Sequence, residues 1–168
     1  MATTHDATAL AQFLGTTPPY SFGAGRFGVM RFHVDMAAVS ASLGATIDGS
    51  ASDVVQLWDI PALTHILSVG IYLWTPEGAA ATVAIGDGDQ TAGFLAAFSI
   101  NGLAGTNKMT LTTDAYGATC GRTYAATDTL DLLFGTAADI DVAVFDVFVP
   151  CIFLDVPDLT TTSPSTWK

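Results

Sequence analysis

Histidine, serine and carboxylate side chains are where chemistry would be expected in this sequence, and their spacing predicts very little of it. His5, His33 and His65 stand far apart, and none lies at the spacing that metal ligands or a catalytic base require. No serine lies in the Gly-x-Ser-x-Gly turn that exposes a nucleophile in hydrolases. The sequence predicts neither a metal site nor a catalytic site. A hydrolase with an unrecognised site is kept only as the weakest of three hypotheses, after the two described below.

Two groups of carboxylates could be mistaken for sites. The stretch 86–89, Gly-Asp-Gly-Asp, has the start of a calcium loop, but an EF-hand needs further oxygen ligands and a distal glutamate, and residues 90–100 supply no acid. A glycine turn between strands is the simpler interpretation. Asp139 and Asp141 share one face of a predicted strand, which is typical of an exposed edge rather than an acid/base couple.

A glycine pattern at residues 23–28, Gly-Ala-Gly-Arg-Phe-Gly, matches the dinucleotide fingerprint by chance. The fingerprint needs a strand before it and a helix after it, and the surrounding sequence predicts neither. The sequence therefore predicts no cofactor and no enzymatic activity.

Aromatic side chains raise an alternative function, a carbohydrate- or receptor-binding β-sandwich module. Trp58 and Trp74 lie in predicted strands among apolar neighbours, which favours packing in the core or at a subunit interface, and Trp167 lies next to the end of the sequence. Exposed, coplanar rings near Tyr72, Trp74 or Tyr116 would support the alternative.

The composition points to a surface that other proteins cover. Half of the residues are hydrophobic and only 12% are charged, whereas about 25% is usual in a globular domain. Interface cores are depleted in charge, so we expect subunit or partner contacts, with a Ser/Thr/Gly-rich surface as the alternative. The net charge of −11 argues against binding nucleic acid or an anionic membrane.

Cellular context follows from the apolar runs and the cysteines. The most apolar run, 140–154, contains two aspartates and a proline and is too short for a membrane helix. The first residues lack the pattern of a secretion signal, which predicts synthesis in a cytoplasm. Cys120 and Cys151 are therefore expected as buried thiols, although a disulfide is left open.

Period-two alternation dominates the middle of the chain. Leu67–Leu73 and residues 81–85 alternate around the turn Pro76-Glu77-Gly78, which predicts a β-hairpin. Residues 37–52 indicate turns around a short strand or one helical turn, and residues 101–114 indicate a surface loop. About eight strands predict an all-β, antiparallel, jelly-roll-like β-sandwich. Further strands are expected at 27–36, 53–60, 93–98, 119–125, 128–134 and 139–154.

Three segments are predicted along the chain. Residues 1–26 form an N-terminal arm, with a short helix over 4–14 and an extended Pro/Gly-rich part, residues 27–157 the sandwich, and residues 158–168 a flexible tail. Tyr20 and Phe22 in the arm are expected to dock on another surface, or on the arm's own domain.

The last strand becomes apolar on both faces from Phe145 onward, so its outer face needs cover. Phe145, Phe148 and Phe153 are the expected interface residues there, and Pro150 is expected at a bulge or bend.

Several phrases of the sequence resemble small virion proteins of tailed bacteriophages, the head decoration or cement proteins. The resemblance covers about residues 53–154 and rests on pattern and phrase rather than on an invariant motif. The phrases are Asp-Val-Val-Gln-Leu-Trp-Asp-Ile-Pro-Ala at 53–62, Ile-Leu-Ser-Val-Gly-Ile-Tyr-Leu at 66–73, Glu-Gly-Ala-Ala-Ala-Thr-Val-Ala-Ile-Gly-Asp-Gly at 77–88, and Tyr-Ala-Ala-Thr-Asp-Thr-Leu-Asp-Leu at 124–132.

The resemblance implies a jelly-roll-like sandwich, commonly a homotrimer, on the outer surface of the capsid. Such a protein bridges subunits of the major capsid protein, is made in the host bacterial cytoplasm, and brings no catalytic residues. In a phage, the carbohydrate- or receptor-binding alternative would be a module of a tail or head fibre.

Overall fold

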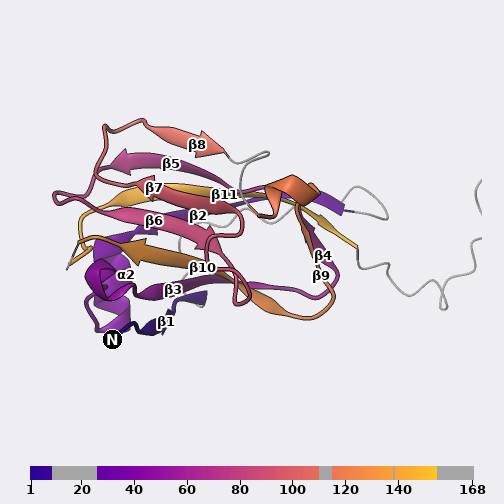
Figure 1. The fold of residues 1–168 in the computed structure, drawn as a ribbon, viewed down its shortest axis with the longest axis horizontal. Coiled ribbons are helices and arrows are strands. Elements are labelled where there is room, and N and C mark those ends of the chain that lie inside the picture. The colour runs from indigo at the N-terminus through magenta and orange to yellow at the C-terminus, as the bar shows by residue number, and fades with distance from the viewer. Residues whose placement is uncertain (9–25, 110–114, 138, 155–168) are drawn as a thin grey trace, which may run out of the picture.

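Two β-sheets pack face to face in the computed structural model, which describes residues 1–8, 26–109, 115–137 and 139–154 (Figure 1). In these residues every strand pair is antiparallel except β1–β3, which is parallel. The arrangement confirms the predicted all-β sandwich.

The five-stranded sheet has its two longest strands, β3 and β10, side by side. Its order is β1 (Thr4–Asp6), β3 (Val54–Ile60), β10 (Asp128–Gly135), β6 (Thr82–Gly86) and β7 (Leu95–Ser99).

The six-stranded sheet is built around β11 (Val144–Phe153), which has a neighbour on each side. One side pairs with β2 (Arg26–Asp35) over ten consecutive residues. The other side pairs first with β5 (Gly70–Thr75) and then with β4 (Thr64–Ile66). Beyond them lie β8 (Asn107–Met109) and β9 (Arg122–Tyr124). The described residues thus hold eleven strands rather than about eight, because β1, β4, β8 and β9 have only three residues each.

Strand β2 shows how the alternation becomes structure. Met30, Phe32 and Val34 point into the core, as the sequence predicts. Asp35 ends the strand because its carboxylate accepts hydrogen bonds from the N–H groups of Ala37 and Ala38, capping α2 (Met36–Leu43). This helix is longer than the single turn that was expected. Short 3-10 helices follow at η1 (Gly49–Ala51) and η2 (Gly117–Thr119).

The core lies between the sheets and is centred on large apolar rings. Phe32, Phe134 and Phe145 are fully buried, on β2, β10 and β11. Burying each ring stabilises the fold by about 1.5–3 kcal/mol. None of the described helices has the length and apolar character needed to cross a membrane.

The predicted hairpin at 67–85 is wrong, although both of its strands exist in part. β5 belongs to the six-stranded sheet and β6 to the five-stranded one, so residues 76–81 cross between the sheets. Glu77 fixes this crossing, since its carboxylate accepts hydrogen bonds from the backbone N–H groups of Val142 (3.1 Å) and Ala143 (3.0 Å). Alternation shows which side chains face the core but not which strands pair.

The N-terminus also differs from the expected helix over 4–14. Thr4–Asp6 form β1 instead, held by Asp53, whose carboxylate accepts a hydrogen bond from the Thr3 N–H (2.7 Å) and pairs with His5 (3.2 Å). The remainder of the expected helix, the Pro/Gly-rich part of the arm and the tail 158–168 lie outside the described residues.

Candidate interaction surface

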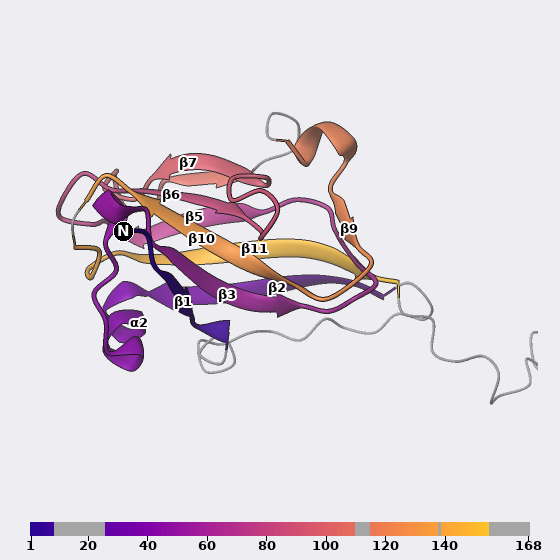
Figure 2. The same cartoon turned by 60° about the horizontal axis from the view of Figure 1, so that its bottom comes forward.

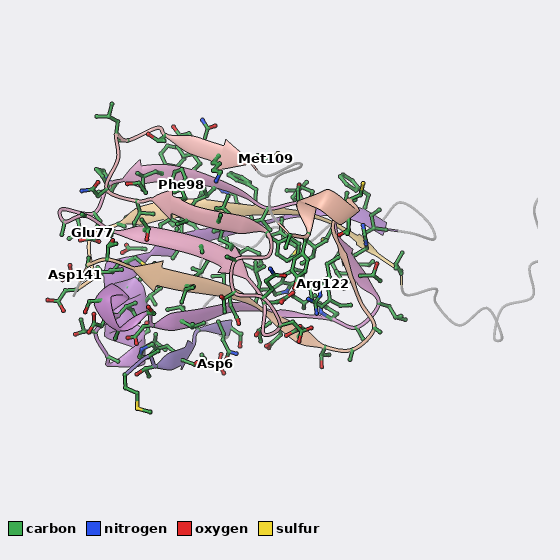
Figure 3. All side chains as sticks on the ribbon, in the orientation of Figure 1. Asp6, Glu77, Phe98, Met109, Arg122 and Asp141 are labelled. Atoms are coloured by element: carbon green, nitrogen blue, oxygen red, sulfur yellow. The ribbon has the colours of Figure 1, made fainter. Side chains whose placement is uncertain are left out.

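The outward face of the six-stranded sheet carries four exposed large apolar side chains. Alternation along β2 turns Phe27 and Val29 away from the core, and they are 52% and 42% exposed. On the same face, beyond β11, Trp74 of β5 is 49% exposed. Met109 of β8 is 51% exposed and lies near the opposite edge of the sheet (Figure 3). We call this surface the outward face. It consists of Phe27, Val29, Tyr72, Trp74, Met109, Phe148, Pro150 and Ile152.

The register explains why these side chains form one surface. Ile152 of β11 stands opposite Phe27, and Pro150 opposite Val29. Phe148 stands opposite Gly70, which in turn stands opposite Met109. Residues opposite one another in a sheet put their side chains on the same face. The apolar side chains therefore run across β2, β11, β5 and β8.

Gly70 gives the outward face a hollow. A hollow of about 290 Å³ lies over it, bordered by Tyr72, Met109 and Phe148. A Cβ added at Gly70 would lie 3.4 Å from the Met109 Cε. The absence of a side chain at this position leaves room for a small apolar side chain of another molecule.

A buried carboxylate lies within this apolar face. Asp146 of β11 is 1% exposed, and its Oδ2 accepts hydrogen bonds from Arg31 Nε (3.1 Å), Arg31 Nη2 (2.7 Å) and Trp74 Nε1 (2.8 Å). Its Oδ1 pairs with His33 Nδ1 at 2.8 Å. Burial alone would raise the pKa of Asp146, but the hydrogen bonds from Trp74, His33 and Arg31 outweigh it and the pKa is lowered. The carboxylate holds β2, β11 and β5 together on the outward side.

Asp87, which the sequence places in a glycine turn, is the centre of a second buried network. Its carboxylate accepts hydrogen bonds from the hydroxyls of Tyr116 (2.9 Å) and Tyr124 (2.6 Å) and pairs with Arg122. Arg122 also pairs with Asp89. Burial, followed by the contact with Asp87, raises the pKa of Tyr116 to about 12. This network joins the 86–93 turn to β9, at the end of the molecule opposite Glu77 (Figure 3).

The other candidates for chemistry are used as structural contacts. His65 contacts the Thr123 hydroxyl (2.8 Å) and the Cys120 carbonyl (3.2 Å). In the described parts of the chain no three His, Cys, Asp or Glu side chains are grouped to hold a metal ion. Cys120 and Cys151 are free thiols, and Cys120 is exposed rather than buried as expected. Burial raises the pKa of the Cys151 thiol to about 11.

The aromatic side chains do not form a flat platform for a sugar ring. The rings of Tyr72 and Trp74 lie 4.6 Å apart between centroids, but their planes are at 62°. Trp58 packs on Phe32, and Tyr116 on Phe94. The coplanar arrangement that the carbohydrate-binding alternative requires is not formed by these rings.

The structure divides the expected interface residues. Tyr20 and Phe22 lie outside the described residues. Phe145 is fully buried between the sheets and is therefore not on the outward face, because odd-numbered residues of β11 point inward. Phe153 also points inward and packs against the end of the core. Only Phe148 belongs to the outward face.

Three exposed members of the outward face were missed: Phe27, Val29 and Met109. The alternation of β2 contained the signal for the first two, because they occupy the positions between the core-facing residues Gly28, Met30 and Phe32. Met109 could not be found in this way, because a three-residue strand is too short to show a period.

Comparison with known proteins bears on the fold. No protein-family model matches the sequence, and no curated protein matches it. A chain of the structure "Capsid of Ralstonia phage GP4" is similar with a TM-score of 0.56 and 14% identity, over 90% of this chain and 97% of that one. A chain of "Cyanophage Pam1 capsid asymmetric unit" is similar with a TM-score of 0.54 and 14% identity, over 83% and 91%. This chain therefore resembles, in its fold, chains found in two phage capsid structures.

Proposed function

We propose that the protein is a structural component of a tailed-phage virion, a decoration or cement protein on the outer surface of the head. The observation that carries the proposal is the likeness to the chain from the Ralstonia phage GP4 capsid structure, which extends over 97% of that chain. A fold matched over almost its whole length supports a role of the whole domain rather than of an inserted module. The role is non-catalytic.

The outward face supports a role in assembly. Exposed apolar side chains that cluster on one sheet are typical of protein–protein interfaces. In our proposal this face lies against subunits of the major capsid protein and bridges them. The net charge of −11 suits an exterior position, since the remaining surface would repel other anionic particles.

Self-association is part of the proposal. A homotrimer would present three outward faces to the capsid at once, and linked contacts raise the apparent affinity well above that of one. Tyr20 and Phe22 would add contacts to a neighbouring subunit or to the capsid. Phe148 would lie in the contact, whereas Phe153 could contribute only at the margin where β11 ends.

A binding experiment tests the proposal directly. Heads of the phage that encodes the chain, prepared without this protein, are mixed with the purified chain, sedimented, and heated. We expect saturable binding at a fixed number of copies per head and a higher temperature of head disruption. Failure of the wild-type chain to bind such heads, together with a monomeric mass in light scattering, would overturn the proposal.

A further inference from the structure

The ten-residue strand β2 forms an edge of the six-stranded sheet, and its length sets it apart. Among the described residues it pairs with β11 on one side only. Figure 2 shows β2 next to β11, at the margin of the six-stranded sheet. The other edge strands are short: β1, β8 and β9 have three residues and β7 has five. Short edges are one way in which proteins avoid adding foreign strands.

The backbone groups at the free edge can be assigned. Met36 N–H donates to the Ala143 carbonyl (3.0 Å), so the residue following β2 points its backbone toward β11. Because backbone groups alternate in direction along a strand, the N–H and C=O groups of Val34, Phe32, Met30 and Gly28 also point toward β11. Pro150, which stands opposite Val29, agrees with this assignment. Its carbonyl accepts a hydrogen bond from the Leu67 N–H (3.0 Å), on the side of β11 away from β2, so it makes no bond to Val29. The N–H and C=O groups that point to the free edge are those of Phe27, Val29, Arg31, His33 and Asp35.

Two usual protections of an edge, a proline and a bulge, are absent from β2. It also contains no lysine. Arg31 does not guard the edge either, because its Nε and Nη2 are bound to Asp146 on the neighbouring strand. The same residues that offer backbone groups also place Phe27 and Val29 on the outward face, so one partner could use both.

We propose that β2 is a strand-addition edge, and that its occupant is an extended segment of the major capsid protein. The segment would continue the sheet with main-chain hydrogen bonds, with apolar side chains beside Phe27 and Val29. A carboxylate of the segment would face Arg31, whose Nη1 has no partner among the described residues and whose side chain is 47% exposed. This inference rests on the proposed function and specifies how the shell partner is held.

Two substitutions at one position test it with the full-length chain and the same heads. Val29→Pro keeps an apolar side chain but removes an edge N–H that β11 does not use. Val29→Thr keeps the N–H and loses apolar character. We expect Val29→Pro to weaken binding to heads by about tenfold or more, and Val29→Thr to weaken it much less. Equal binding by wild type and Val29→Pro would overturn the proposal, as would a greater loss for Val29→Thr, which indicates side-chain docking alone.

Hydrogen exchange of the wild-type chain provides a measurement that needs no variant. In the isolated protein, the amides of Phe27, Val29, Arg31 and His33 should exchange fast, while those of Gly28, Met30, Phe32 and Val34 are protected. The first set should become protected on heads. Protection of the first set in the isolated protein means that the chain itself covers the edge, which overturns the proposal. Failure of wild type to bind heads at all removes the proposed function and this inference together, whereas binding without new protection removes only this inference.

Discussion

The indole N–H of Trp74 donates a 2.8 Å hydrogen bond to the Asp146 carboxylate, which is itself 1% exposed although it lies on the outward side of the sheet. Trp74 is half-exposed, and its indole is one of the groups that contact the carboxylate. The contact joins β5 to β11, and the same carboxylate joins β11 to β2 through Arg31 and His33. The exposed apolar side chains of the outward face therefore surround an ionic centre that joins the three strands.

Replacing Trp74 with Phe should destabilise the fold by about 1–2 kcal/mol at neutral pH, because one hydrogen bond to a buried charge is lost. The effect should shrink as the pH falls below 3.8. The lowered pKa of Asp146 means that its charged form stabilises the fold above that pH, and this stabilisation is lost once the carboxylate takes up a proton. Urea unfolding at pH 7 and pH 3 measures both values. An equal loss at the two pH values would show that ring packing, not the hydrogen bond, is responsible.

Replacing Met109 with Glu should leave stability nearly unchanged, because the side chain is half-exposed on a three-residue edge strand. Binding to phage heads should weaken by about tenfold or more, since a charge would be buried at the edge of the hollow over Gly70. Leu103→Glu is the matched control, because Leu103 is 84% exposed and lies outside the outward face. Equal binding by the two variants would exclude the outward face from the contact.

The sequence predicted the long strands but not all of the three-residue strands, and not which strands pair. In β2 the alternation assigned the inward residues correctly, because a strand with one buried face repeats every two residues. In β11 the pattern did not separate Phe145, which is buried, from Phe148, which lies on the outward face: both are large and apolar, so composition alone could not tell the core ring from the surface ring. Counting two residues at a time from Asp146, whose charge marks the outward side, separates them.

Long-range contacts account for the errors of pairing. Nothing in the local sequence around Pro76 shows that Glu77 will bind the N–H groups of Val142 and Ala143, 65 and 66 residues away. β1 likewise depends on Asp53, which only the fold brings close to His5. Buried carboxylates that bind distant backbone groups leave no periodic pattern in the local sequence. Strands that depend on them therefore cannot be predicted from hydrophobic periodicity.

Replacing Glu77 with Gln should lower the free energy of unfolding by about 1–2 kcal/mol, because hydrogen bonds to a charged acceptor become bonds to a neutral one. Glu77 is the only glutamate in the sequence and is 5% exposed. Asp141→Asn is the control, since Asp141 is an exposed acid close to the same loop (Figure 3). Chemical denaturation compares the two, and a smaller loss for Glu77→Gln than for Asp141→Asn would contradict the anchoring role.

Replacing Asp131 with Asn should change how stability depends on pH, in the direction opposite to Trp74→Phe. Burial, and then the negative charges of Asp128 and Asp87, raise the pKa of Asp131 from 3.8 to about 6. Its Oδ1 has no hydrogen-bond partner among the described residues. Between these two pH values the folded state binds a proton that the unfolded state releases, so wild-type stability falls as the pH rises through this window.

Asparagine is neutral throughout, so the Asp131→Asn protein should not lose stability between pH 4 and pH 7 through this position. Relative to wild type, we expect its free energy of unfolding to gain about 1–3 kcal/mol from pH 4 to pH 7, the amount that a shift of this size represents. The Asn amide has a stability cost that does not depend on pH, so this cost cancels when the free energies of unfolding at the two pH values are compared within each protein. Asp59→Asn serves as the control, because Asp59 is an exposed acid on the neighbouring strand β3. Parallel curves for wild type and Asp131→Asn would mean that the Asp131 carboxylate is solvated in the folded protein.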